Sequence, residues 1–509
     1  MSLENPLFAP LAAPPRRRPK AVLRLLAAVV ALLAASTGRA EVTAVVNPQS
    51  NWGTWEGWGV SLCWWANVFG QRDDLADLVF TLKPTYLKEA NATLPGLGLN
   101  IVRYNAGACS PNAVDGATMV VSPHIPAFRQ IEGYWTYGGD SDPASPAWNW
   151  NADANQRAML LKARDRGADR FELFSNSPMW WMCANHNPSG SANGTDDNLA
   201  PAFEHEHALY LATIAQHARD DWGITFTSVE PFNEPTANWW KAAGTQEGCH
   251  FSPALQAKLI ADLHSELSRR GLATTVVSAS DESFYQQALD TWNSFSAGTR
   301  ADVGRVNVHG YQYDAGPRSA LHAAVAGNKL WNSEYGDKDG SGITMAANLD
   351  RDFHELHMTA WCYWQALDSG GWGLVQSNPG DRWIGPANPK YYVLAQYCRH
   401  IRSGMTILDS GDPNSVAAYD AREGKLIIVT ENPGAARSVT YDLTRFAAAA
   451  GPVIRWLTTT DGGELYVRHD DVILSRKCFT CSTPAKSVQT FEIRNVDLLP
   501  GSAASTSSN

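Results

Sequence analysis

The chain has 509 residues, of which 44% are hydrophobic and 18% charged, so its composition excludes an intrinsically disordered protein. This length allows two domains, or one large barrel with an appended domain. The 41 basic and 51 acidic residues give a formal net charge of −10, which argues against nucleic acid or an anionic membrane surface as a partner.

Residues 1–40 have the pattern of a signal peptide. A basic segment at 16–20 precedes an apolar run at 21–35, and small residues at Gly38 and Ala40 match a signal peptidase site. The apolar run is short for a membrane span, which needs roughly 20 residues. We therefore expect cleavage near Ala40, a secreted protein and no membrane contact afterwards; a signal anchor is the alternative.

Residues 41–55 look extended, and eight strand-like runs then alternate with amphipathic helical segments over residues 56–402. The expected strands are residues 57–65, 99–107, 171–181, 226–235, 274–280, 305–313, 329–337 and 358–365. The clearest expected helices are 154–166, 202–221 and 252–270. The last of these opens with Ser252 and Pro253, a favourable cap and first-turn pair, and ends at Gly271.

Eight strands with intervening helices predict an α/β fold, a (β/α)8 TIM barrel over residues 56–402. A doubly wound sheet is the structural rival, but it usually carries a glycine-rich phosphate loop after its first strand. Here the first strand leads into Trp64, Trp65, Ala66 and Asn67, which cannot cradle a phosphate.

Residues 403–497 change in texture to short alternating runs separated by turn residues, which predicts an attached C-terminal β-sandwich domain. The extended segment 41–55 is expected to join this sandwich. The Ser- and Ala-rich tail at 498–509 is expected to be disordered.

Eight cysteines in an exported protein suggest some disulfides. Cys478 and Cys481 form a CxxC motif late in the chain, for which a local disulfide is a better interpretation than zinc or redox chemistry. Asn91 and Asn193 each begin a possible N-glycosylation sequon.

Two segments carry the candidate chemistry. VEPFNEP ends at Glu234 and Pro235, and LWNSEYGD carries Glu334, so each puts a carboxylate at the end of a strand-like run. These are strands 4 and 7 of the predicted barrel, whose carboxyl ends surround one mouth. Two carboxyl groups roughly 5 Å apart at such a mouth would suit a retaining glycosidase.

The surroundings only slightly favour one assignment of roles. Arg103 and Tyr311 are expected to bind Glu334 and keep it ionised as the nucleophile. Apolar neighbours of Glu234 favour its protonated form, which suits the general acid/base. Glu230, the rival acid on strand 4, is interpreted as a structural residue inside the barrel.

The chain holds 20 tryptophans, which either fill the core or stack against sugar rings. For any single tryptophan, a place in the core is the more common outcome. Asn176 and His309 also stand at strand ends. The candidate substrate-binding residues are Arg103, Asn176, Asn233, His309, Tyr311, Trp64, Trp181 and Trp361. No regular metal-ligand spacing is present, so we expect neither metal nor cofactor.

The ordered motifs GWGVSLCWW, IVRYN, SNSPMWWM, VEPFNEP, HGYQY, WNSEYG and YYVLAQYCRHIRSG resemble glycoside hydrolase family 30 over roughly residues 42–497. The chain is most similar to the endo-β-1,6-galactanase branch. This resemblance implies a barrel with a tightly attached β-sandwich and retention of configuration. It also implies Glu234 as acid/base and Glu334 as nucleophile, with Arg103 and Asn233 supporting the nucleophile and the sugar 2-hydroxyl.

The resemblance therefore predicts a secreted enzyme that acts on β-1,6-galactan, such as arabinogalactan side chains. We expect a monomer whose partner is its polysaccharide substrate. Two loops, at residues 183–198 and 238–249, have no clear match in the family and leave the sugar open. A related glycosidase acting on β-1,6-glucan, xylan or glucosylceramide is the alternative. A non-catalytic carbohydrate-binding protein is the alternative from another class.

Overall fold

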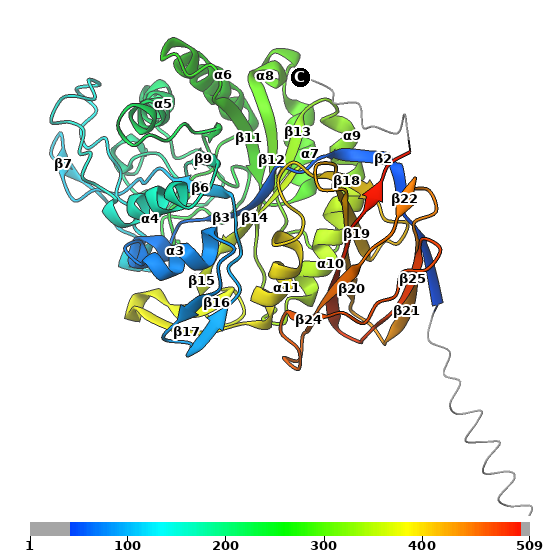
Figure 1. Cartoon of the computed structure of the whole chain (residues 1–509). Helices are drawn as coiled ribbons and strands as arrows, with labels where there is room; N and C mark the ends of the chain where they lie inside the picture. The colour runs from blue at the N-terminus through cyan, green and yellow to red at the C-terminus, as the bar shows by residue number, and fades with distance from the viewer. Residues whose placement is uncertain (1–40, 500–509) are drawn as a thin grey trace, which may run out of the picture. The chain divides into compact units, whose positions relative to one another are not determined.

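The structure is a computed structural model that describes residues 41–499 (Figure 1). The predicted signal peptide at 1–40 and residues 500–509 of the predicted tail lie outside the described residues. Across residues 41–499, no helix combines the length and the apolar character needed to cross a membrane.

Eight parallel strands close into a barrel, which confirms the predicted fold class. Neighbouring strands pair around the ring, and the last strand closes it by pairing with the first, where Trp361 lies opposite Trp58. In chain order the strands are β3 (Gly57–Ser61), β6 (Ile101–Asn105), β9 (Arg170–Phe174), β10 (Ser228–Glu230), β11 (Val276–Glu282), β12 (Val303–His309), β13 (Lys329–Tyr335) and β14 (Ala360–Gln365).

Helices surround the barrel on its outer side (Figure 1). Helix α6 shows why they form where they do: the Ser252 hydroxyl accepts a hydrogen bond from the Leu255 amide at 3.4 Å, and Pro253 occupies the first turn. The helices are α2 (Trp65–Phe69), α3 (Asp73–Phe80), α4 (Ala154–Asp165), α5 (Glu204–Asp221), α6 (Pro253–Arg269), α7 (Tyr285–Ser294), α8 (Ala297–Asp302), α9 (Arg318–Ala324), α10 (Ile343–Arg351) and α11 (Pro389–Cys398).

Several short strands lie in the loops between the barrel strands and helices. They form the pairs β4 (Thr85–Leu87) with β5 (Ala92–Leu94) and β7 (Ala113–Val114) with β8 (Ala117–Thr118). A three-stranded sheet of β15 (Leu367–Asp368), β16 (Val375–Asn378) and β17 (Trp383–Ala387) follows the last barrel strand.

Two further sheets make the β-sandwich. The larger has the order β2 (Asn47–Thr54), β18 (Thr406–Asp409), β19 (Ser415–Asp420), β20 (Lys425–Asn432), β26 (Ser487–Ile493), β23 (Val453–Thr459) and β24 (Val467–His469). The smaller contains β1 (Glu41–Val45), β21 (Arg437–Asp442) and β25 (Cys478–Thr483), and β22 (Ala448–Ala449) pairs with β27 (Val496–Asp497). The N-terminal strand β2 thus lies in the same sheet as strands from beyond residue 403.

The larger sheet is buried on both faces, which explains the continuous apolar run in β20. Side chains alternate between faces along a strand. Leu426 and Ile428 therefore pack into the sandwich core, whereas Ile427 and Val429 pack into the larger core shared with the barrel. A strand that is apolar at every position is what burial on both faces requires.

Helices α10 and α11 lie between the barrel and this sheet (Figure 1). The Gln396 side chain on α11 donates to the Thr458 hydroxyl at 2.9 Å and accepts from the Thr490 hydroxyl at 2.7 Å. Buried polar groups are thus paired across the contact, and the sandwich is firmly attached to the barrel.

The predicted disulfide between Cys478 and Cys481 is wrong, because all eight cysteines are free thiols. Both residues belong to β25 and are three positions apart. Residues at that spacing point to opposite faces of a strand. Cys481 is buried in the sandwich core, whereas Cys478 is only partly buried, so the two sulfurs cannot meet.

Candidate active site

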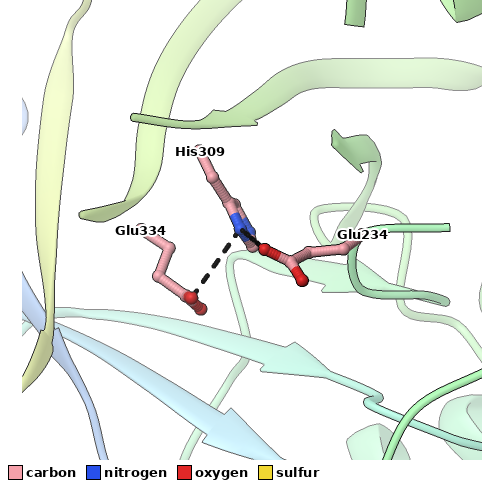
Figure 2. Close-up of side chains that lie close together, drawn as sticks. All are labelled: Glu234, His309 and Glu334. Atoms are coloured by element: carbon pink, nitrogen blue, oxygen red, sulfur yellow. Dashed lines mark hydrogen bonds and ion pairs between the residues drawn. The ribbon is translucent and has the colours of Figure 1, made fainter. Parts of the chain in front are cut away.

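The two predicted glutamates meet at the carboxyl ends of the barrel strands. Glu234 follows β10, Glu334 lies in β13, and His309 ends the intervening strand β12. One carboxylate oxygen of each glutamate and one ring nitrogen of His309 all lie within 4.8 Å of one another. Figure 2 shows the imidazole between the two carboxylates. Residues 100 positions apart are therefore neighbours.

Glu234 is held in an unusual backbone conformation. Its φ of 48° lies in the left-handed region, which costs a non-glycine residue free energy. Its amide donates to the Asp281 carbonyl at 2.9 Å, and its carbonyl accepts from the Trp240 indole at 2.9 Å. These bonds impose the conformation that turns the carboxylate toward Glu334.

Glu334 accepts two hydrogen bonds from the groups that were expected to bind it. The Arg103 guanidinium donates to Oε2 and the Tyr311 hydroxyl to Oε1, each at 2.8 Å. Burial nevertheless raises the pKa of Glu334, against the opposing charges of His309 and Arg103, and the nearby Glu234 adds to the rise. The two donors fix the orientation of this carboxylate.

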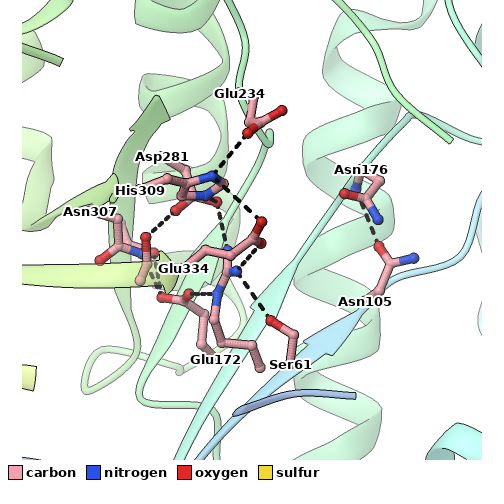
Figure 3. Close-up of polar contacts among 12 residues, drawn as sticks. Ser61, Asn105, Glu172, Asn176, Glu234, Asp281, Asn307, His309 and Glu334 are labelled. Carbon is pink, nitrogen blue, oxygen red and sulfur yellow. Dashed lines mark hydrogen bonds and ion pairs between the residues drawn. The ribbon is translucent and has the colours of Figure 1, made fainter. Parts of the chain in front are cut away.

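Arg103 extends the network beneath the site. Its guanidinium also donates to Glu172 at 2.9 Å and to Asp281 at 2.6 Å, so one cation meets three carboxylates. All of these groups are buried. The pKa of Asp281 is lowered to about 2. Burial by itself would raise this pKa, but the positive charges of Arg103 and His309 outweigh that effect. Figure 3 shows Glu172, Asp281 and Glu334 gathered around this point.

His309 links the two glutamates to this network. Its Nδ1 lies 3.2 Å from Glu234 Oε1 and 3.7 Å from Glu334 Oε1, and its Nε2 lies 3.1 Å from Asp281. Burial alone would lower the pKa of His309, but the charges of Glu334 and Asp281 raise it to about 10. The imidazole therefore carries a positive charge at neutral pH; its Nδ1–H donates to Glu234, and its Nε2 side forms an ion pair with Asp281.

Glu234, His309 and Glu334 also form the one group of three potential metal ligands within residues 41–499. A protonated imidazole has no free lone pair, so it cannot bind a cation while it donates to carboxylates. The contacts of His309 are those of an ion-pair network, and a metal would require its deprotonation.

A cleft of about 560 Å³ opens above the two glutamates. Aromatic side chains form much of its wall, and the Arg129 guanidinium lies 4.1 Å from the ring centre of Trp64. Flat apolar faces interspersed with polar groups suit a sugar ring. The remaining lining residues are Asn233, Trp239, Trp240, Gly244, Thr245, Gln246, Tyr311, Trp364, Asp368, Ser369 and Trp372.

Five of the eight predicted substrate-binding residues are not in the cleft wall. Arg103 and His309 are buried and contact the two glutamates instead, and the other three lie elsewhere. Trp361 points outward from β14 and packs against Trp58 in the core. Trp181 is buried and donates its indole N–H to the Trp135 carbonyl at 2.9 Å. Asn176 is buried beside Asn105, away from the group around Glu334 (Figure 3). Trp64, Asn233 and Tyr311 do line the cleft.

The sequence interpretation missed several residues of the site. Asp281 immediately follows the predicted strand 274–280, and a carboxylate at a strand end was the available signal. Glu172 lies inside predicted strand 171–181, and no sequence feature there distinguishes a site residue from a residue of the core. Trp239 and Glu247 belong to the unmatched loop 238–249, which has no pattern to guide an assignment.

Glu230 lies inside the barrel and away from the cleft wall. Burial raises its pKa well above the ordinary value, and repulsion from Asp281 and Glu172 adds to the rise. A raised pKa favours the neutral carboxyl group, whose burial costs less free energy than that of a carboxylate. This agrees with its interpretation as a structural residue.

A parallel eight-stranded barrel with paired carboxylates beneath an aromatic cleft fits the class of O-glycosyl hydrolases. The family model for O-glycosyl hydrolase family 30 matches residues 41–305. An endo-beta-1,6-galactanase from Hypocrea rufa is 53% identical over 479 residues, covering 93% of this chain and 99% of that protein. The chain therefore belongs to O-glycosyl hydrolase family 30, and it is an O-glycosyl hydrolase.

Two further comparisons are more distant. An exo-beta-1,6-galactobiohydrolase from Bifidobacterium longum is 24% identical over 410 residues, which are 62% of this chain and 26% of that protein. The catalytic domain of a family 30 xylanase C from Talaromyces cellulolyticus superposes with a TM-score of 0.66 at 20% identity, covering 89% of this chain and 99% of that domain. The second comparison supports the fold alone.

Proposed function

We propose that this enzyme is a secreted endo-hydrolase that cleaves β-1,6-linked galactan, including side chains of arabinogalactan, with retention of configuration. The observation that supports the mechanism is the approach of the Glu234 and Glu334 carboxylates within 4.8 Å. Retaining glycosidases need carboxyl groups about 5 Å apart, whereas inverting enzymes need about 6.5–9.5 Å to admit a water. The galactan substrate is supported by the 53% identity to the Hypocrea rufa enzyme.

In the first step, Glu334 attacks the anomeric carbon and forms a glycosyl ester while Glu234 protonates the departing oxygen. Arg103 and Tyr311 hold the two oxygens of Glu334 in place, so the nucleophile does not have to reorient. Their role is to orient this carboxylate in the free enzyme and to stabilise it when the ester is released.

In the second step, Glu234 accepts a proton from water, and the resulting hydroxide attacks the anomeric carbon and releases Glu334. The negative charge therefore passes from Glu334 to Glu234 and back during one turnover. His309 contacts both carboxylates, at 3.2 and 3.7 Å, so its positive charge stabilises whichever glutamate is ionised.

Asn233 is proposed to bind the sugar 2-hydroxyl. It lines the cleft next to Glu234, and its buried Oδ1 has no hydrogen-bond partner within the described residues. A buried acceptor without a partner is costly, and a substrate hydroxyl would satisfy it.

Two measurements test this proposal. Proton NMR of the first products from a β-1,6-galacto-oligosaccharide should show the β-anomer before mutarotation; an initial α-anomer would contradict retention. Product analysis on β-1,6-galactan, pustulan and glucuronoxylan should give a series of short oligosaccharides from galactan. Products from pustulan or glucuronoxylan alone would assign a different family 30 sugar.

Secretion and the monomeric state are separate parts of the proposal. The full chain expressed in a secreting host should appear in the medium with an N-terminus close to residue 41, and light scattering should give the mass of one chain. Retention in the membrane fraction would favour the signal-anchor alternative, and a dimer mass would contradict the monomer.

A further inference from the structure

Trp239 differs from the other tryptophans of the cleft in its exposure. It has 40% of its surface exposed, whereas Trp64 and Trp240 have 3%, Trp364 has 8%, and Trp372 is partly buried. A large indole ring left open to solvent in a cleft wall has an apolar face available for a ligand. Trp239 follows Glu234 by five residues in the unmatched loop 238–249, so no sequence motif singles it out.

The indole of Trp239 forms a direct hydrogen bond with the Glu234 side chain. Its Nε1–H donates to Oε2 at 3.1 Å, while His309 contacts Oε1 at 3.2 Å. An indole N–H is a donor only, so this bond persists whether Glu234 is protonated or ionised. The carboxyl group is therefore held at both oxygens, once from the end of β12 and once from the loop.

The loop that carries Trp239 is itself anchored at both ends. Near its start, Trp240 donates to the Glu234 carbonyl at 2.9 Å and lies against Trp239 with ring centres 6.1 Å apart. Near its end, the buried Glu247 accepts from the Ile131 amide at 3.0 Å and from the Asn105 side chain at 3.1 Å. The ring of Phe284 also lies near Trp239, with ring centres 6.0 Å apart.

We propose that Trp239 is the platform for the sugar on the leaving-group side and, through its indole N–H, a positioning residue for Glu234. This inference rests on the proposed acid/base role of Glu234. The acid must lie against the glycosidic oxygen, and Glu334 must lie against the anomeric carbon. An exposed ring bonded to the acid therefore stands beside the sugar that departs with that oxygen.

The two roles are separated by two substitutions. Trp239→Phe keeps an aromatic face but removes the N–H, whereas Trp239→Ala removes both. Each variant is assayed on a β-1,6-galacto-oligosaccharide, whose leaving alkoxide needs a proton, and on the 4-nitrophenyl glycoside of β-1,6-galactobiose, whose leaving phenolate needs little protonation.

For Trp239→Phe we expect kcat on the oligosaccharide to fall about tenfold, since one hydrogen bond to an ionisable group is lost, with KM changed less than about twofold. The kcat/KM for the nitrophenyl glycoside, which reports only on the first step, should remain near the wild-type value, whereas its kcat also depends on Glu234 as the base of the second step. For Trp239→Ala we expect the same loss in kcat and, in addition, a KM for the oligosaccharide raised about tenfold, because the stacking surface is gone.

Trp383→Phe is the matched control. Trp383 is the other half-exposed tryptophan of the described residues, at 50%, and it does not line the cleft, so this variant should behave as wild type on both substrates. Thermal melting of all variants should show that each is folded at the assay temperature.

Equal losses in kcat/KM for Trp239→Phe on both substrates, or no loss on either, would overturn the positioning role. An unchanged KM in Trp239→Ala would overturn the platform. Glu234→Ala keeps failure of this inference distinct from failure of the proposed function. If Glu234→Ala retains wild-type activity on the oligosaccharide, the acid/base assignment itself is wrong; if it loses that activity while the Trp239 variants do not, only the inference fails.

Discussion

The interior of the barrel and the core of the sandwich are equally buried but differ in chemistry. The barrel interior beneath the cleft holds Arg103, Glu172, Asp281 and His309, all connected through ion pairs. The sandwich core is filled by hydrocarbon and aromatic side chains such as Phe479 and Phe491, whose ring centres lie 5.2 Å apart.

This difference in chemistry separates function from stability: the charged barrel interior serves the site, and the apolar sandwich core serves stability. Burying an ion costs several kcal/mol, which ion pairing offsets only in part, whereas burying apolar surface is favourable. The charged interior orients Glu234 and Glu334 at a cost in stability. The apolar sandwich stabilises the domain without contributing a residue to the cleft wall.

The largest effect on activity is expected from Glu334→Gln. Removing the proposed nucleophile should lower kcat by a factor of about 10⁴ or more. The same change removes a buried negative charge that is repelled by Glu234, so the melting temperature should not fall. Rates and calorimetric melting check both parts; a variant that is inactive because it has unfolded would contradict the second.

Arg103→Met should lower both the free energy of unfolding and the enzymatic activity. It leaves Glu172, Asp281 and Glu334 without their shared cation, and breaking a buried pair in this way costs about 3–5 kcal/mol. Activity should also fall, because Glu334 loses one of its two orienting donors. Urea unfolding and steady-state rates at a temperature where the variant is folded measure the two effects. Full stability in this variant would show that the network is not held by Arg103.

Phe491→Ala tests the opposite side of the comparison. Truncating this fully buried ring should lower the free energy of unfolding by about 3–5 kcal/mol through lost burial and a cavity. Below the new melting temperature kcat should remain at the wild-type value, since the sandwich core does not reach the cleft. A reduced kcat in folded protein would mean that the two regions are coupled.

Glu247→Gln should change how stability depends on pH. Burial raises the pKa of Glu247 to about 7, from 4.5 for the free side chain. A raised pKa stabilises the folded protein at low pH, and this contribution is lost as pH rises from about 4.5 through 7, on the order of 3 kcal/mol in total. The side chain of the glutamine variant does not titrate, so the variant does not lose this stability as pH rises. The difference in free energy of unfolding between variant and wild type should therefore rise by that amount between pH 4.5 and 8; a constant difference would contradict the raised pKa.

Cys478→Ser is expected to have the smallest effect. The thiol is partly exposed and forms no disulfide, so the free energy of unfolding should change by less than about 0.5 kcal/mol. Added reductant should likewise leave the melting temperature of the wild type unchanged. A reductant-dependent melting temperature would point to a disulfide that the structure does not contain.

The barrel could be predicted because the local sequence of each strand has a strand-like apolar pattern. All eight expected runs overlap an observed strand, and the helix expected at 252–270 is observed at Pro253–Arg269. The third and fourth strands are the least accurate: they were expected over 171–181 and 226–235 but end at Phe174 and Glu230. The chain leaves the strand after Glu230, and the left-handed backbone at Glu234 is imposed by Asp281 and Trp240 from outside this segment.

The individual tryptophans show the limit of prediction from sequence. Trp361 and Trp364 are three positions apart in the same strand, β14, and therefore point to opposite faces, and only Trp364 lines the cleft. Which face of a strand points to the substrate depends on the register of the barrel. Composition could therefore indicate a ligand with flat faces, but not which rings meet it.

The sequence by itself determined the eight strands, the sandwich and the two candidate glutamates, because these follow from local periodicity and from residue types at strand ends. Only the tertiary structure decided that His309 stands between the two glutamates, that Asp281 supports it, and that Trp239 reaches Glu234. Those contacts join residues from different strands and loops. Their geometry depends on how the barrel closes, and closure is a property of the whole chain.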